Sequence, residues 1–290
     1  MHVKQLYAGR FGWSGYGTYE PVKAAADFLE KENVGGKIFN TYEAGNYLLY
    51  RGQKVFIDGR NVDYGYDFLR RTINAGGEVT DFRSLEKEFG FTVAVVQFEY
   101  FAQLNPLPFA SVLDGLDDWA LVEIDDASAI YVKRDETHRA LIEKFGYTVL
   151  RPEILIRPAQ AIVALPTENL DRLNDELIRA EQTLPTSIRP RLARATLYLL
   201  AGAFDEAEKL AQQVHLLAPE RYEPFDILAM VRVSQERYAE AGMLLEESIR
   251  LAGGEASTEI DANFVADIFE KAGNTQKASY YRSLSPRWAD

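Results

Sequence analysis

The chain has 290 residues, which is enough for two domains that each bury a hydrophobic core. Its net charge of −12 argues against a general surface for nucleic acids or anionic membranes, because both need a basic footprint. Local basic patches remain possible, although no run of Lys or Arg stands out. The chain has no Cys, which excludes disulfides, thiolate metal sites and cysteine nucleophiles.

Residues 1–18 form a lead-in that is rich in Gly and aromatic residues. This segment has no long apolar run, so it does not form a signal peptide. Its aromatic side chains, among them Phe11, Trp13 and Tyr16, suit either a membrane interface or packing onto the domain that follows. We interpret the lead-in as a segment that emerges from a last membrane helix, which would make the chain an excised C-terminal region.

Residues 19–134 are predicted to form a three-layer α/β domain with a mixed sheet, because strand-like apolar runs alternate there with helical patterns. The expected helices are 21–32, 43–50, 64–74 and 82–89, and the expected strands before the final hairpin are 37–40, 54–58 and 92–98. We expect Val55, Ile57, Val93, Val95 and Ile124 in the core, with Val55 and Val93 on neighbouring or next-neighbouring parallel strands. The runs 119–124 and 129–133 flank a turn too short for a parallel crossover, which predicts a β-hairpin.

Several blocks of this domain together resemble a known family. They are 38–40 with 42–49, 55–60 with Tyr64, 119–125 and 130–134. They are similar to the soluble extracytoplasmic domain that follows the membrane helices in bacterial polytopic proteins related to dolichyl-phosphate-mannose-protein mannosyltransferases. The resemblance covers roughly 19–134, and the Phe56–Arg60 block is its most specific part. It implies a location and a parent of glycosyltransferase type, but no catalytic residue, because the catalytic carboxylates of such parents lie in membrane-proximal loops that this chain lacks.

Four polar residues follow the expected parallel strands, where an open α/β sheet places its ligand crevice. They are Asn40, Asp58, Arg60 and Glu99. Asp58 and Arg60 could hold a sugar hydroxyl or a phosphate, because Arg offers a bidentate fork and Gly59 lets the backbone approach closely. The alternative is structural: Asp58 caps the following turn and Arg60 pairs with a neighbouring carboxylate.

No pattern in the chain predicts a catalytic residue, a metal site or a cofactor. Asp125 and Asp126 resemble the paired carboxylates of metal-dependent sugar-nucleotide transferases, but they lie in a hairpin turn, where Asp is favoured for local hydrogen bonds. The three histidines, His2, His138 and His215, are too scattered for a metal-ligand spacing or a catalytic triad.

Residues 135–166 are predicted to link the α/β domain to a second domain. The linker contains one helix, 138–145, followed by the run 151–158, which begins and ends near a proline and has an apolar centre. We expect this run to be an extended segment pinned to a surface.

Residues 167–290 are predicted to form tetratricopeptide-like helical repeats. Phe204 and Ala207 recur as Tyr238 and Ala241 at an offset of 34 residues, the period of a two-helix repeat. Ala207 and Ala241 are small residues that fit the close contact between the helices of a hairpin. The helix 168–183 reads as the second half of an incomplete unit, and Ala278 marks a displaced last unit with a longer connection at 253–258. A plain helical bundle is the alternative.

The organisation of the chain favours a non-catalytic region that binds a protein partner through its repeats, on the extracytoplasmic side of a bacterial membrane. One alternative is that the α/β domain helps to bind a sugar donor or acceptor for a membrane-embedded active site, through Asp58 and Arg60. Another is a free-standing cytoplasmic adaptor. No nucleic-acid partner is expected, and contact with a membrane would arise only through a missing N-terminal transmembrane region.

Overall fold

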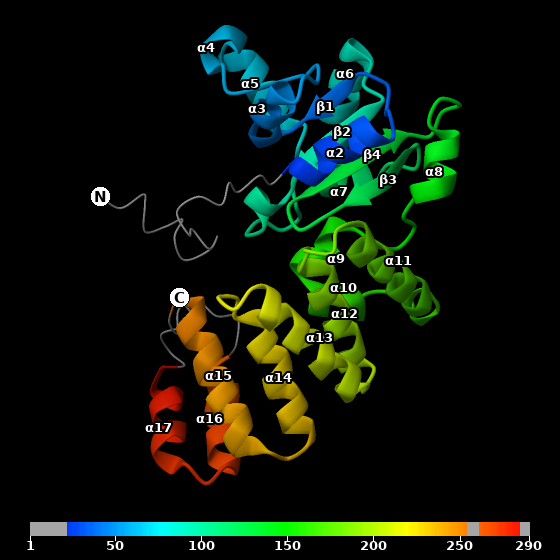
Figure 1. The fold of residues 1–290 in the computed structure, drawn as a ribbon. Helices are drawn as coiled ribbons and strands as arrows, with labels where there is room; N and C mark the ends of the chain where they lie inside the picture. The colour runs from blue at the N-terminus through cyan, green and yellow to red at the C-terminus, as the bar shows by residue number, and fades with distance from the viewer. Residues whose placement is uncertain (1–21, 254–260, 285–290) are drawn as a thin grey trace. The chain divides into compact units, whose positions relative to one another are not determined.

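The computed structural model describes residues 22–253 and 261–284. These residues form two compact units, one comprising 22–190 and the other the described residues from 191 onward. The first unit is a sheet with helices on both faces and the second is made of helical hairpins, so the predicted fold class is confirmed (Figure 1). The lead-in 1–18 lies outside the described residues. The predicted boundaries at 134 and 166 stay predictions.

The sheet has four strands in the order β1-β2-β4-β3. Strand β1 pairs with β2 in parallel, and β2–β4 and β4–β3 are antiparallel. A register shift between Leu121 and Glu123 places a bulge in β3. The predicted hairpin β3–β4 is therefore confirmed. The strands are β1 Ile38–Asn40, β2 Val93–Gln97, β3 Trp119–Ile124 and β4 Ser128–Lys133.

Each face of the sheet is covered by helices because side chains of alternating strand positions are apolar on both faces. On one face, Val93, Val95 and Ile130 pack against helices α2, α3 and α8. On the other face, the Phe39 ring lies 5.3 Å from the Phe82 ring of α6, edge to face. These helices are α2 Lys23–Lys31, α3 Tyr42–Tyr50, α6 Val79–Phe89 and α8 Arg139–Phe145, and α7 Ala110–Asp114 contacts β3.

The segment 54–58 is not a strand, so the prediction that Val55 and Val93 lie on nearby parallel strands is wrong. Instead, β1 is the parallel neighbour of β2. The Phe56 amide and the Ile57 carbonyl of the segment form hydrogen bonds with the Asn40 side chain and not with the backbone of a neighbouring strand. Ile57, Val93, Val95 and Ile124 are buried as predicted, whereas Val55 is half-buried. The segment leads into α4 Asn61–Tyr64 and α5 Tyr66–Asn74.

The run 151–158 is helical, so the predicted extended segment is wrong. Pro152 and Pro158 each open a helix, because proline fixes φ near the helical value and its missing N–H is not needed in the first turn. The helix predicted at 138–145 is present as α8. The remaining elements of this unit are η1 Glu99–Phe101, α9 Pro152–Ile156, α10 Pro158–Val163, η2 Thr167–Asn169 and α11 Leu170–Thr183. Helix α11, which the sequence assigns to the repeats, groups with the sheet.

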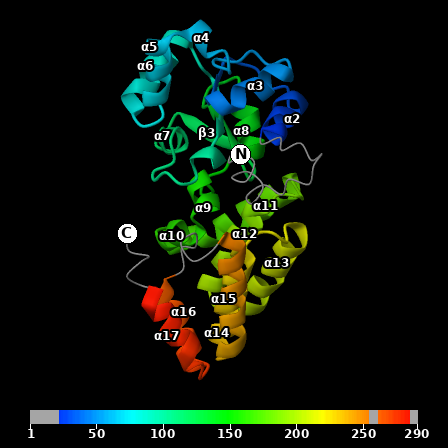
Figure 2. The same ribbon diagram turned by 90° about the vertical axis from the view of Figure 1, so that its left-hand side faces the viewer.

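The second unit consists of helices that pack in pairs. Helices α14 and α15 contact each other extensively, as do α16 and α17, and Figure 2 shows each pair side by side. Ala207 and Ala241 are buried, as predicted, and Ala278 at the matching position of the last hairpin is buried as well. None of the helices among the described residues is long and apolar enough to cross a membrane. The helices are α12 Arg189–Leu200, α13 Phe204–Leu217, α14 Glu223–Ser234, α15 Tyr238–Ala252, α16 Ala262–Lys271 and α17 Thr275–Leu284.

Candidate functional site

Asn40 joins the edge strand β1 to the segment that was expected to be a strand. Its Nδ2 donates to the carbonyl oxygens of Ile57 at 2.7 Å and Thr41 at 2.9 Å, and its Oδ1 accepts from the Phe56 amide at 2.8 Å. Asn40 is fully buried. A buried amide whose donors and acceptor are satisfied in this way fixes the path of the chain. Asn40 therefore has a structural role and presents no free group to a ligand.

Asp58 and Arg60 pair with each other. The buried Asp58 carboxylate accepts from the Arg60 backbone amide at 2.9 Å, and from Arg60 Nε at 2.9 Å and Nη2 at 2.6 Å. Hydrogen bonding to Arg60, with a further contribution from the Tyr64 hydroxyl, lowers the pKa of Asp58 to about 2. The Asp58 carboxylate is buried, whereas the Arg60 side chain that covers it is 62% exposed, with its guanidinium group at the solvent side. This geometry matches the structural alternative for the carboxylate and leaves only the outer edge of Arg60 open to a ligand.

Glu99 does not join this group. Its carboxylate lies 3.6 Å from the Arg189 guanidinium, and both side chains are largely buried. The structure therefore brings together Asn40, the segment before Asp58, and Arg60, while Glu99 belongs to a separate ion pair. Asn46 of α3 is a member of the first group that the sequence reasoning missed: its Oδ1 accepts from the Gly59 amide at 2.9 Å.

Replacing Arg60 by Ala is expected to lower the melting temperature at neutral pH, because the buried Asp58 carboxylate loses its cation. The depressed pKa of Asp58 means that its contribution to stability is present above about pH 4, the unfolded value, and is lost as the pH falls toward about 2. The difference in melting temperature between wild type and variant should therefore shrink across that range. Thermal unfolding at several pH values measures it, and an undiminished melting temperature at neutral pH would favour a ligand-binding role for Arg60.

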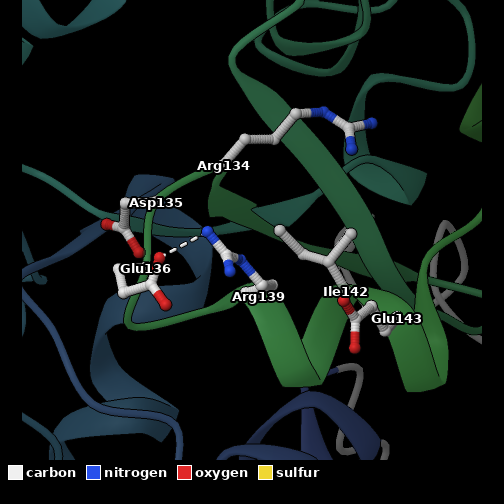
Figure 3. A pocket seen from close by; sticks show the side chains of 6 residues that line it. All are labelled: Arg134, Asp135, Glu136, Arg139, Ile142 and Glu143. Atoms are coloured by element: carbon white, nitrogen blue, oxygen red, sulfur yellow. Dashed lines mark ion pairs between the residues drawn. The ribbon is translucent and has the colours of Figure 1, made fainter.

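A hollow of about 290 Å³ lies at the start of α8 (Figure 3). It is lined by Arg134, Asp135, Glu136, Arg139, Ile142 and Glu143. Arg139 pairs with Glu136 across its rim at 2.5 Å, and both side chains are mostly exposed. Next to it, the buried His138 ring is held between Asp135 Oδ1 and the Gly35 carbonyl, each at 2.9 Å. The charges of this hollow largely compensate one another, and no three acidic or histidine side chains of the described residues meet in a metal-binding group.

Asp125 and Asp126 serve the structure, as their place in a turn indicates. Asp125 Oδ1 accepts from the amides of Ala127 at 2.8 Å and Ser128 at 2.6 Å, which closes the β3–β4 turn. Asp126 accepts from the Ile188 amide at 2.9 Å and the Arg189 amide at 2.7 Å, so it caps the N-terminus of α12 from a distant part of the sequence. The sequence gives no signal for this second contact.

The hairpin turns of the second unit repeat at the atomic level. Gly202, Glu236 and Gly273 all have a left-handed backbone, with φ of 76°, 59° and 77°. The next residue in each turn donates its amide to the carbonyl five residues earlier: Ala203 to Tyr198, Arg237 to Arg232 and Asn274 to Phe269. This is the Schellman end of a helix. It recurs at offsets of 34 and 37, the spacing that the sequence predicts.

Glu236 occupies a position that favours glycine, and this makes a matched pair of substitutions possible. Glu236→Gly should stabilise the protein by about 1 kcal/mol, because it relieves the left-handed strain of a residue with a Cβ. Gly202→Ala should destabilise it by a similar amount, since an added Cβ meets no atom within 4 Å and only the backbone conformation opposes it. Denaturant unfolding of both variants measures the effects. Shifts of the same sign would show that the two turns are not equivalent.

Similarity between this chain and known proteins is confined to solved structures. No family model matches the chain. No curated protein matches it either. Among solved structures, two crystal forms of MamA AMB-1 are similar to it at 17% and 18% identity, with TM-scores of 0.38 and 0.37. Each match covers 52% of this chain, and 86% and 87% of MamA, respectively. MamA MSR-1 is similar at 17% identity over 52% of this chain and 84% of its own, with a TM-score of 0.36.

Proposed function

We propose that the chain is a non-catalytic scaffold whose helical repeats hold a protein partner. The observation that supports this most strongly is the recurrence of the same buried alanine and the same left-handed turn in successive hairpins. Stacked hairpins of this kind expose an extended surface made of equivalent helices, which is how repeat proteins bind other proteins.

The first helices of the hairpins are the proposed partner surface. Leu199 of α12 and Val233 of α14 are equivalent residues at an offset of 34; both are half-buried, and the covered part of Val233 packs against the core of this unit. Met230, also on α14, is 37% exposed. Apolar side chains that remain partly uncovered can bury further area against a bound segment, and such burial drives association.

A photo-crosslinking amino acid placed at equivalent positions tests this proposal in cells. Leu199 and Val233 represent the first helices, and Asp205 and Ala239, an exposed pair at the same offset without a large apolar side chain, represent the second helices as matched controls. We expect both first-helix positions to crosslink to one and the same protein, and the controls to give none. Crosslinks from the controls alone, or from no position, would contradict the proposal.

We further propose that the chain belongs to the extracytoplasmic side of a bacterial membrane, as part of a protein of glycosyltransferase type. This rests on the sequence blocks around Phe56–Arg60. Within that setting the exposed edge of Arg60 is the group that a sugar or phosphate ligand would contact. An alkaline phosphatase fused to the C-terminus of the full-length gene product tests the location: activity is expected outside the cytoplasm, and an inactive but stable fusion points to the cytoplasmic adaptor.

A further inference from the structure

Two carboxyl groups are buried at the end of β3, two residues apart in the chain. Glu123 belongs to β3, and Asp125 follows directly after the last residue of that strand, so the two residues are one extended repeat of two positions apart and their side chains extend toward the same face of the sheet. Their residues are 3% and 5% exposed. In the described part of the chain no Lys or Arg pairs with either carboxyl group, and Glu123 Oε2 accepts no hydrogen bond there. Two buried acids without a cation can remain together at low cost only while at least one of them is protonated.

The surroundings of the pair do not supply the missing positive charge. The Tyr147 amide donates to the Leu121 carbonyl of β3 at 2.9 Å, and the guanidinium of Arg179 lies 4.0 Å above the ring of Tyr147, where it donates to the Gly146 carbonyl. On the other side Asp125 is followed by the acidic Asp126. Burial, together with the neighbouring acid in each case, raises the pKa of both carboxyls above their ordinary values. The hydrogen bonds that Asp125 accepts from Ala127 and Ser128 act in the opposite direction.

A chain of hydrogen bonds links the pair to the start of α12. Asp125 shapes the turn through Ala127 and Ser128, and the next residue, Asp126, holds the N-terminus of α12 through the Ser187 hydroxyl and the amides of Ile188 and Arg189. A change in the geometry of residues 125–128 therefore reaches the first turn of α12 through a single side chain.

We propose that Glu123 and Asp125 form a pH-sensitive latch, which holds the start of α12 through Asp126 when the pair is protonated and releases it when both carboxyl groups ionise. The sign follows from linkage. As the pH rises above about 4, the unfolded chain gives up these protons while the folded chain retains them, so the folded arrangement loses stability with rising pH until its own carboxyls ionise. Two buried like charges next to Asp126 then repel each other, and opening the turn lets water reach them.

Hydrogen exchange of the Ile188 and Arg189 amides, expressed as protection relative to the unstructured chain, tests the latch in the full chain. Between about pH 5 and about pH 9 the protection should fall roughly tenfold in the wild type, corresponding to the ionisation of the pair. In Glu123→Gln, which keeps the shape and removes one charge, the protection should stay constant. The Arg237 amide in the α14–α15 turn is the internal control and should be unaffected by pH in both proteins.

Three results would overturn the proposal. One is equal protection of Ile188 and Arg189 in the wild type at both ends of the pH range. Another is a fall that is the same in Glu123→Gln, or that the Arg237 amide shares, since this would indicate global loosening. The third concerns Asp126→Ala, which removes the acceptor and should lower protection of both amides even at low pH. If that variant retains full protection, Asp126 does not hold α12.

Discussion

Gly45→Ala is expected to destabilise the α/β unit by about 3 kcal/mol, although alanine normally favours a helix interior. A Cβ at this position of α3 would lie 1.9 Å from the Ile57 carbonyl oxygen and 2.9 Å from Asn40 Nδ2. The substitution therefore pushes α3 away from the segment that Asn40 holds, and it disrupts the buried hydrogen bond from Asn40 Nδ2 to the Ile57 carbonyl oxygen.

Denaturant unfolding monitored by circular dichroism measures the effect. Gly35→Ala is the matched control, because a Cβ there meets no atom within 4 Å. We expect the control to remain within about 0.5 kcal/mol of the wild type. If Gly45→Ala is as stable as the control, α3 does not pack against residues 56–58 as described.

Glu176→Ala is expected to cost about 3 kcal/mol, because it leaves buried donors without an acceptor. The Glu176 carboxylate is 3% exposed and accepts from the amides of Thr148 at 2.8 Å, Val149 at 3.0 Å and Leu150 at 2.8 Å, as well as from the Thr148 hydroxyl at 2.7 Å. These bonds fasten α11 to the loop that follows α8. They outweigh the effect of burial and hold the pKa of Glu176 below its ordinary value.

Glu176→Gln separates the hydrogen bonds from the shape of the side chain. The amide nitrogen of glutamine would face amide donors, so this variant should lose most of the same stability even though its volume is unchanged. Asp175→Ala, at an exposed position of the same helix, is the control and should have little effect. A Gln variant as stable as the wild type would show that the carboxylate is not the acceptor for all three amides.

The sequence predicts much of the fold because local patterns determine it. The 34-residue offset between Ala207 and Ala241 identifies the hairpins, and the short turn after Ile124 requires antiparallel strands. The segment 54–58 was wrongly predicted to be a strand, because an irregular segment that is buried also requires apolar residues. Its partner is a side chain, Asn40, and side-chain pairing leaves no periodic signal.

The candidate site was predicted only in part. Asp58 and Arg60 are two residues apart, so their pairing is a local effect that the sequence can suggest. By contrast, Glu176 and Asp126 bind amides 26–28 and 62–63 residues away, and only the fold brings these groups together. Gly45 lies inside a helical pattern, where glycine is disfavoured, and this local signal of close packing was not used in predicting the site.

The second unit is a stack of equivalent hairpins that recur at offsets of 34 and then 37 residues. Because the chain has no Cys, the rate of thiol labelling in single-cysteine variants tests it without background. Cysteine replacing Ala207, Ala241 or Ala278, which are all buried, should be protected in the folded protein. Cysteine replacing Lys209, Met243 or Tyr280, two residues further along each helix and exposed, should react at rates close to those of the unfolded chain. Similar labelling rates at the buried and the exposed positions would contradict the repeat. So would equal rates at Ala278 and Tyr280 alone, because the last hairpin would then not be equivalent to the others.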